Sequence, residues 1–188
     1  MRFGLIVILC FTITNIIGQA TTDNCVSNVL LSAYSERAYS TEPVTDEQLD
    51  IILKCGIKSP SARNLQPWKF TVIKDEAALK EIITNVVAGN VAIVISGVES
   101  ENGTTTDFDC GLATEAMFVA AHGLGLGARI YGGPIGTVNF ARERFQIPAG
   151  YRPVMILRIG NVDKTVDAVS AATPRKTPEE VVNYFRGM

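Results

Sequence analysis

The amino-acid sequence predicts an α/β or α+β protein with a central sheet covered by helices. Three observations lead to this class. Stretches with helical spacing of apolar residues alternate with short β-prone runs along most of the chain. The run at 91–98 is almost continuously apolar, as in a strand that is buried on both faces. With 188 residues, 47% of them hydrophobic, the chain can form one domain with a substantial core.

The first half of the chain carries the signals of three helices and two strands. Apolar residues at helical spacing over 26–33 predict a first amphipathic helix. Thr45 and Gln48 form a capping box, which predicts the start of a second helix whose apolar stripe extends to Ile57. The other elements expected here are a strand at 68–73, a third helix at 79–86 and the buried strand at 91–98.

A helix expected at 109–124 dominates the second half. Its apolar residues occur almost all round, so the helix lies either at the centre of the core or between two subunits. A short strand at 128–133 follows and stops at two consecutive glycines. A further helix at 138–145 and a strand at 152–160 complete the predicted core.

Two cations, Arg175 and Lys176, lie close to the carboxyl end of the chain. They precede a capping box at 177–180 with Pro178 at the first helical position, which predicts a terminal helix. The amino terminus of a helix attracts anions, so cations beside it are typical of a phosphate site. The alternative is a solvated basic pair in front of a terminal helix.

A loop framed by Pro60 and Pro67 connects the second helix to the first strand. Each proline fixes its own φ and disfavours helix in the residue before it, so the loop should be stiff. Between them, Ser61, Asn64 and Gln66 offer hydrogen-bonding side chains that suit a flat ligand with polar edges. An ordinary helix-to-strand connection with polar turn residues is the alternative.

The first twenty residues have the features of an export signal. Arg2 precedes an apolar run at 3–17, and Gly18-Gln19-Ala20 places small residues where a signal peptidase cleaves. Cleavage after Ala20 would leave a single domain over 21–188, which would be located in the periplasm or secreted from the cell. Without cleavage the protein would be membrane-associated or cytoplasmic. The apolar run is shorter than the roughly 20 residues of a stable membrane span.

The net charge, the cysteines and the single histidine limit the classes of ligand that the chain could bind. The net charge of −2 gives no basic surface for nucleic acid, which leaves small molecules and protein partners. The cysteines after the leader form no metal-binding spacing. We expect Cys55 and Cys110 to be small buried residues and Cys25 to be free. The single histidine, His122, falls in the apolar helix and is expected to be structural.

Six motifs occur along the chain in a defined order. They are Ser35-x-Arg37, Pro43-Val44, the proline-framed segment at 60–68, Gly125-Leu126-Gly127, the segment at 147–153 and the segment at 174–180. Over residues 29–185 this order resembles the nitroreductase-like FMN-dependent oxidoreductases. The resemblance implies an α+β three-layer sandwich whose central sheet is mostly antiparallel. It also implies a homodimer with two FMN molecules at the subunit interface.

The resemblance further implies a ping-pong reaction, in which NAD(P)H reduces the flavin and a nitroaromatic, quinone or similar acceptor then reoxidises it. The flavin carries the hydride chemistry, so no protein acid or base is required. The residues implied at the cofactor site are Ser35, Arg37, Pro60, Ser61, Ala62, Asn64, Gly132, Gly133, Arg175 and Lys176. The cations would neutralise the phosphate, and Ser35 would add a neutral donor. The loop at 60–64 would contact the ribityl chain and ring from the partner subunit. The glycines would let a backbone N–H approach flavin N5.

This chain departs from the family pattern at three places. Ala33 stands where the family usually has an arginine. The connection before Val91 is short, and Asn85 or Asn90 would have to replace flavin contacts that larger relatives make there. The later insertion that shapes the acceptor pocket is reduced to the loop before Asp107. Together with the export signal, these departures leave two alternatives: a flavin-binding module without turnover, or a dehydrogenase or dehalogenase that uses another donor.

Overall fold

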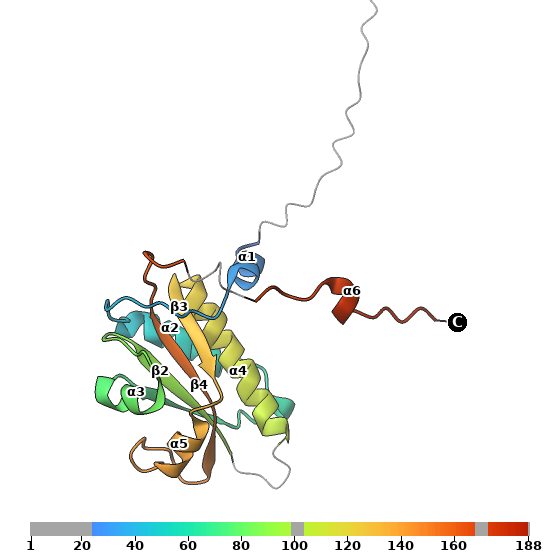
Figure 1. The fold of residues 1–188 in the computed structure, drawn as a ribbon. Coiled ribbons are helices and arrows are strands. Elements are labelled where there is room, and N and C mark those ends of the chain that lie inside the picture. Colours follow the sequence, from blue (N-terminus) through green and yellow to red (C-terminus); the bar gives the residue numbers. More distant parts are fainter. Residues whose placement is uncertain (1–23, 99–103, 168–172, 188) are drawn as a thin grey trace, which may run out of the picture.

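The computed structural model describes residues 24–98, 104–167 and 173–187, so the predicted leader lies outside the described residues. A four-stranded antiparallel sheet forms the centre of the molecule, with strand order β1-β2-β4-β3 (Figure 1). The strands are β1 (Trp68–Ile73), β2 (Val91–Val98), β3 (Leu126–Tyr131) and β4 (Tyr151–Asn161).

Six helices occur in the described part of the chain, and four of them cover the two faces of the sheet. The six are α1 (Cys25–Ser32), α2 (Asp46–Ile57), α3 (Glu76–Ile82), α4 (Thr104–Gly123), α5 (Ile135–Phe140) and α6 (Pro178–Val181). Helices α2 and α4 pack on one face, while α3 and α5 pack on the other (Figure 1). The predicted α+β three-layer sandwich is therefore confirmed.

Strand β2 separates two hydrophobic cores. Ile93 and Ile95 face α2 and α4, whereas Ala92 and Val94 face α3 and α5. Because side chains alternate along a strand, a strand with a core on each side is apolar at every position. The continuous apolar run at 91–98 predicted this central position, and every residue of it except Val98 is buried.

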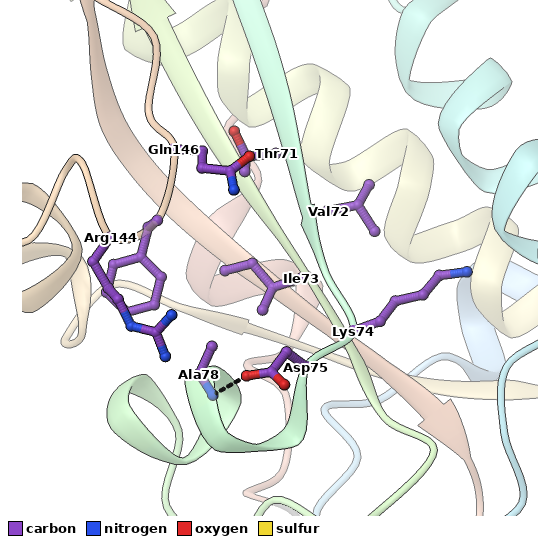
Figure 2. Close-up of a pocket in the computed structure, with 9 residues that line it drawn as sticks. Thr71, Val72, Ile73, Lys74, Asp75, Ala78, Arg144 and Gln146 are labelled. Carbon is purple, nitrogen blue, oxygen red and sulfur yellow. Dashed lines mark hydrogen bonds between the residues drawn. The ribbon is translucent and has the colours of Figure 1, made fainter.

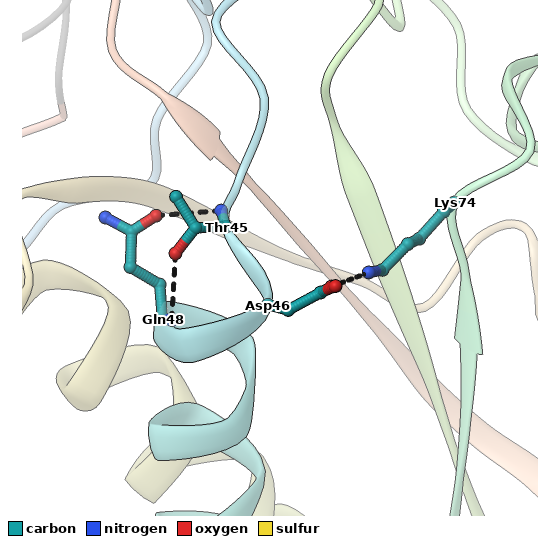
Figure 3. A network of polar contacts seen from close by, with 4 residues as sticks. All are labelled: Thr45, Asp46, Gln48 and Lys74. Atoms are coloured by element: carbon teal, nitrogen blue, oxygen red, sulfur yellow. Dashed lines mark hydrogen bonds and ion pairs between the residues drawn. The ribbon is translucent and has the colours of Figure 1, made fainter.

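The capping box of α2 has the predicted geometry (Figure 3). The Thr45 N–H donates to Gln48 Oε1 at 3.0 Å, and the Gln48 N–H donates to Thr45 Oγ1 at 3.2 Å. Next to it, Asp46 forms an ion pair with Lys74, which directly follows β1. These contacts fix the start of α2 and so determine where its other end delivers the loop at 59–67.

Several element boundaries differ from the sequence prediction. The third helix was expected at 79–86 but ends at Ile82, because Ile83 is already extended and Asn85 adopts a left-handed φ of 61°. Helix α4 begins at Thr104 rather than at 109. Its first turn is rich in Thr and Asp, so the apolar periodicity that predicted the helix does not reveal this turn.

Two boundaries near β3 also differ. The strand starts at Leu126 and ends at Tyr131, two residues earlier at each end than predicted. Gly125, with φ 76°, ends the helical path and lets the strand begin at once. Helix α5 spans Ile135–Phe140 instead of 138–145, and the chain continues in turns to Gln146, whose φ is 52°.

The two terminal segments pack little against the rest of the chain. Helix α1 forms at the predicted place, but it has no buried residue, and Leu31 is 87% exposed. Every residue of the segment 173–187 is exposed, and α6 lies well away from the sheet (Figure 1). The capping box of α6 is present as predicted. No helix in the described part of the chain has the length and hydropathy to cross a membrane.

Candidate functional site

The first candidate segment is the turn at 34–39, which contains Ser35 and Arg37. Ser35 forms a parallel bridge with Ala128 at the start of β3, and the Glu36 N–H donates to the Ala128 carbonyl at 3.0 Å. Strand β3 therefore holds the backbone of the turn. The side chains of Ser35 and Arg37 are left exposed to solvent.

A buried carboxylate, that of Glu36, fixes this turn from within. Its Oε1 accepts hydrogen bonds from the backbone N–H groups of Arg37 and Ala38, both at 2.8 Å. Its Oε2 accepts one from the Tyr34 hydroxyl at 2.7 Å, which raises the pKa of Tyr34 to about 12. Glu36 is fully buried, so these donors provide the hydrogen bonds that a buried carboxylate requires.

Gly127 makes room for the Glu36 side chain. A Cβ at Gly127 would lie 2.5 Å from Glu36 Cγ and 2.9 Å from its Cβ, which is too close for any larger residue. Gly127 belongs to the Gly125-Leu126-Gly127 motif of the sequence. The structure thus explains part of that motif by the packing of one buried acid.

The second candidate segment is the proline-framed loop at 59–67. Its centre is a short 3-10 turn at Ala62–Asn64, and the Gln66 N–H donates to the Ser61 hydroxyl at 3.0 Å to close the loop. Arg63, Asn64 and Gln66 adopt left-handed φ angles of 53°, 56° and 49°. Asn64 is exposed, and Ser61 and Ala62 are half-buried.

A second buried carboxylate holds this loop. Asp109 on α4 is 2% exposed, and its two oxygens lie 3.1 and 3.2 Å from the Ala62 nitrogen, which donates to them. The Ala62 N–H is therefore already used within the chain. Any contact of Ala62 with a ligand would involve its carbonyl or its methyl group.

A hollow of about 710 Å³ lies beside the loop. Its volume is in the range of small-molecule and cofactor sites. Arg63 is the one charged side chain among the residues that line it, since these are Ala62, Arg63, Leu65, Pro67, Val98, Thr105 and Thr106. The loop thus borders a space that could take a ring-sized ligand.

The turn and the loop lie near opposite ends of α4. Asp109, close to the start of this helix, contacts the loop. The ring of His122, close to the end of the helix, packs against the Tyr34 ring at 5.8 Å between centroids. At a rise of about 1.5 Å per residue, roughly 20 Å of helix separates these two contacts. A single chain therefore does not bring the two segments together.

The remaining predicted residues form two further groups. Gly132 and Gly133 follow β3 in an exposed turn, and a Cβ built at either one meets nothing within 4 Å. Their backbone is therefore open to a ligand. Arg175 and Lys176 lie in the exposed segment 173–187. Within the part of the chain that the structure describes, neither these cations nor Arg37 forms an ion pair.

Another hollow, of about 200 Å³, lies between β1 and the turn after α5 (Figure 2). Its charged side chains are already engaged. Asp75 accepts a hydrogen bond from the Ala78 N–H at 2.8 Å, Arg144 pairs with Glu81 at 2.9 Å, and Lys74 pairs with the start of α2. None of the predicted cofactor residues lines this hollow, so we do not regard it as the candidate site.

The suggestion that Asn90 replaces a missing flavin contact is wrong. Asn90 is 2% exposed, and its Oδ1 accepts from Arg158 Nε at 2.9 Å and from Arg158 Nη2 at 2.6 Å. Arg158 also lies 4.0 Å from the centroid of the Tyr39 ring and donates to the Asn85 carbonyl at 2.9 Å. Asn90 therefore helps to hold a buried cation in the core. The side chain of Asn85 is exposed.

The three described cysteines form no disulfide, and the single histidine packs against aromatic rings. Cys110 is buried as predicted, and burial raises the pKa of its thiol to about 12. Cys55 is half-buried and Cys25 is exposed, and all three are free thiols. Burial lowers the pKa of His122, whose ring packs 4.6 Å from that of Phe118. No cluster of metal-binding side chains occurs among the described residues.

Comparison with known proteins assigns the chain and its fold to one family. The sequence model of the nitroreductase family matches residues 30–95 and 86–161, which include the turn, the loop and all four strands. The chain belongs to the nitroreductase family. Two archaeal relatives are named as candidate NADH dehydrogenases/NAD(P)H nitroreductases. One, from Archaeoglobus fulgidus, is 35% identical over 103 residues, and the other, from Methanothermobacter thermautotrophicus, is 32% identical over 138 residues.

These alignments cover parts of the nitroreductase relatives. The first spans 50% of this chain and 59% of the A. fulgidus protein, and the second spans 67% of this chain and 71% of the M. thermautotrophicus protein. Solved structures match over more of the chain. A candidate nitroreductase from Desulfovibrio desulfuricans, in complex with FMN, is 26% identical with a TM-score of 0.75 over 89% of this chain and 100% of that one.

A nitroreductase from Desulfitobacterium hafniense, also with bound FMN, shares 20% identity with this chain. Its TM-score is 0.72, and the match covers 87% of this chain and 99% of that one. These likenesses confirm the nitroreductase fold. The match to the family model confirms the family that the motifs of the sequence indicated.

Proposed function

We propose that this nitroreductase-family protein is an FMN-dependent oxidoreductase. In this proposal it passes electrons from NAD(P)H through bound FMN to a nitroaromatic, quinone or similar acceptor in a ping-pong reaction. The observation that carries it is the match to the D. desulfuricans protein, which binds FMN and shares 26% identity over 89% of this chain. The names of the archaeal relatives support NAD(P)H as the donor.

The residues of this chain suit FMN. The cations Arg37, Arg175 and Lys176 have no ion-pair partner among the described residues, which fits a role in binding a phosphate. Each charge-assisted hydrogen bond to the phosphate would contribute about 1.5–3 kcal/mol. The exposed Ser35 hydroxyl lies in the same turn as Arg37 and would add a neutral donor.

The ring and the ribityl chain would contact the loop and the glycine turn. Pro60, Ser61 and Asn64 would contribute side chains, and Ala62 its methyl group or carbonyl, because Asp109 occupies its N–H. The exposed backbone at 132–133 would donate an N–H to flavin N5, since no Cβ intervenes. Bound FMN supplies the hydride-transfer chemistry, so the protein's task is to bind and orient.

We further propose a homodimer in which each site combines the turn of one copy with the loop of the other. The position of the two segments near opposite ends of α4 supports this arrangement. An apolar groove of about 560 Å³ runs between the end of α2 and α4, as expected of a face that a second copy covers. Residues that line it include Leu112, Ala116 and Val119.

Export of the protein is a separate proposal. Removal of residues 1–20 would place the domain in the periplasm or outside the cell, where NAD(P)H is scarce and another donor would be needed. Amino-terminal sequencing of the protein purified from its native host tests this: a start at residue 21 supports export, and an intact leader contradicts it.

An absorbance spectrum of the purified chain tests the main proposal. We expect a yellow protein, or a colourless one that takes up added FMN, whose flavin band NADH or NADPH bleaches without oxygen and a quinone restores. A protein that does not take up FMN would contradict the proposal. A flavin band that neither nucleotide bleaches would instead support a binding module or another donor.

A pair of variants tests the phosphate assignment. Replacing both Arg37 and Arg175 by glutamine should weaken retention of FMN strongly, because the phosphate loses two of its proposed cations. Arg144→Gln is the matched control, because it removes an arginine that pairs with Glu81 beside the other hollow. Unchanged affinity in the double variant would refute the assignment.

A further inference from the structure

We propose that Glu36 is a specificity-determining residue of the cofactor site, whose carboxylate weakens the preference for FMN over riboflavin, the flavin without a phosphate. This inference rests on the proposed function, because it requires that the turn at 34–39 faces the phosphate of the flavin. It adds a residue that none of the sequence motifs singles out, since the position between Ser35 and Arg37 is open in the motif.

The first argument is that the turn's own anion site is already filled. Consecutive backbone N–H groups that point to one spot form a concavity that binds anions. At this turn the N–H groups of Arg37 and Ala38 both donate to one oxygen of Glu36 at 2.8 Å. A phosphate that approaches the turn therefore finds the Arg37 guanidinium and the Ser35 hydroxyl, but not these backbone donors.

The second argument concerns charge. The carboxylate of Glu36 and the guanidinium of Arg37 give the turn no net charge, so its attraction for a phosphate dianion is reduced. The buried cation Arg158 lies over the Tyr39 ring and donates to Asn90 Oδ1 in the core. With 2% of its surface exposed, Arg158 cannot contact a phosphate itself.

The third argument is that the carboxylate is held in place. Glu36 is fully buried against Gly127, and the Tyr34 hydroxyl donates to its second oxygen at 2.7 Å. A carboxylate in low-dielectric surroundings acts over a longer range than one in water. Because the carboxylate lies next to the proposed phosphate contacts, it should weaken the binding of ligands that carry a phosphate. It should leave the binding of ligands without a phosphate unchanged.

Binding of two flavins to Glu36→Gln tests the proposal. Glutamine keeps an oxygen for both N–H groups and can donate its amide to the Tyr34 oxygen, so the turn should stay folded. By titration of the apo protein we expect the Kd of FMN to fall about three- to tenfold, while the Kd of riboflavin stays unchanged. The gain for FMN should shrink as salt is raised.

Two variants serve as controls. Arg37→Gln should shift the ratio of the two Kd values the opposite way, because it weakens FMN alone. Glu76→Gln removes the same charge from the exposed pair with Lys80 on α3 and should change neither Kd. Thermal unfolding of each variant checks that it is folded.

The outcomes separate this inference from the proposed function. A Glu36→Gln protein in which both flavins change alike, or neither changes, would show that the carboxylate only holds the turn and would overturn the inference. A wild-type protein that binds neither flavin would overturn the inference and the proposed function together. A wild-type protein that binds both, with an unchanged ratio in the variant, would overturn the inference alone.

Discussion

The turn at 34–39 and the loop at 59–67 are both exposed segments of the proposed site, but a buried carboxylate holds each of them in a different way. Each exposes proposed cofactor contacts, and each is held by a buried carboxylate that accepts hydrogen bonds from the backbone. Glu36 lies inside its own turn and accepts from three donors, two of them backbone. Asp109 comes from α4, far along the chain, and accepts from the single N–H of Ala62.

The difference indicates how firmly each segment is fixed. The turn also has the bridge between Ser35 and Ala128 of β3 and a second bridge between Tyr39 and Val162, so several contacts must break together before it moves. The loop is held at its centre by Asp109, at Pro67 by the Val98 N–H, which donates to the Pro67 carbonyl at 2.9 Å, and by its own closing bond to Ser61. It also contains three residues with left-handed φ. We infer that the turn is a rigid anchor and that the loop is the part that opens first.

The largest effect is expected from Glu36→Ala. Loss of the carboxylate leaves three donors without their acceptor and a small cavity against Gly127, so the free energy of unfolding should fall by about 3–4 kcal/mol. Urea unfolding of the apo protein measures this. Glu36→Gln, which keeps an acceptor, should lose much less, and equal stability of the two variants would contradict the anchor role.

Gly127→Ala should be the next most harmful change. The new Cβ would lie 2.5 Å from Glu36 Cγ, and such overpacking costs about 1–3 kcal/mol. Glu36→Ala removes the closest contact, the one with Cγ, and keeps the one with Cβ at 2.9 Å. The same substitution should therefore cost less in a Glu36→Ala background. A double-mutant cycle by urea unfolding measures this coupling, and additive losses would refute the predicted contact.

Asp109→Ala should act on the loop alone. The half-buried Ala62 N–H loses its acceptor, so the free energy of unfolding should fall by about 1–2 kcal/mol. Trypsin should then cut faster after the exposed Arg63 than in the wild type. Asp109→Asn keeps an oxygen for the N–H and is the control. Equal rates of cleavage in all three proteins would show that Asp109 does not restrain the loop.

The smallest effect concerns pH at the other end of α4, beside the turn. Burial lowers the pKa of His122 below its usual 6.5, so the unfolded chain binds its proton more readily than the folded one. The free energy of unfolding should therefore fall as the pH drops below about 6.5. Comparison of wild type with His122→Phe at pH 7.5 and 5.5 isolates this contribution. Identical pH dependence of the two proteins would exclude it.

Much of the fold could be predicted because it depends on local patterns. The apolar run at 91–98 identified the central strand, and the Thr45 capping box identified the start of α2. Boundaries failed where polar residues or left-handed backbone decide them, as at the first turn of α4 and at Asn85. The spacing of apolar residues does not reveal a polar first turn or a residue with left-handed φ.

The exposed residues of the candidate site could be proposed from motifs. The buried acids that hold these residues in place could not. From the sequence alone, Glu36 and Asp109 would be taken for acids exposed to solvent. Glu36 is buried against Gly127 and Asp109 against Ala62, and both of these partners lie far away along the chain. One signal was present: Asp109 opens an otherwise apolar stretch of helix, where an acid is expected to have a partner. The buried Arg158 within an apolar strand gave the same signal.

The most direct test of the account is to split the proposed site between two copies. Arg37→Glu damages the turn and Asn64→Asp damages the loop, and each variant alone should retain little FMN. Co-expression with two different affinity tags allows the hybrid dimer to be purified and its flavin counted. If each site joins the turn of one copy to the loop of the other, the hybrid has one intact site and should hold about one FMN per dimer. A hybrid dimer that holds no FMN would contradict the account.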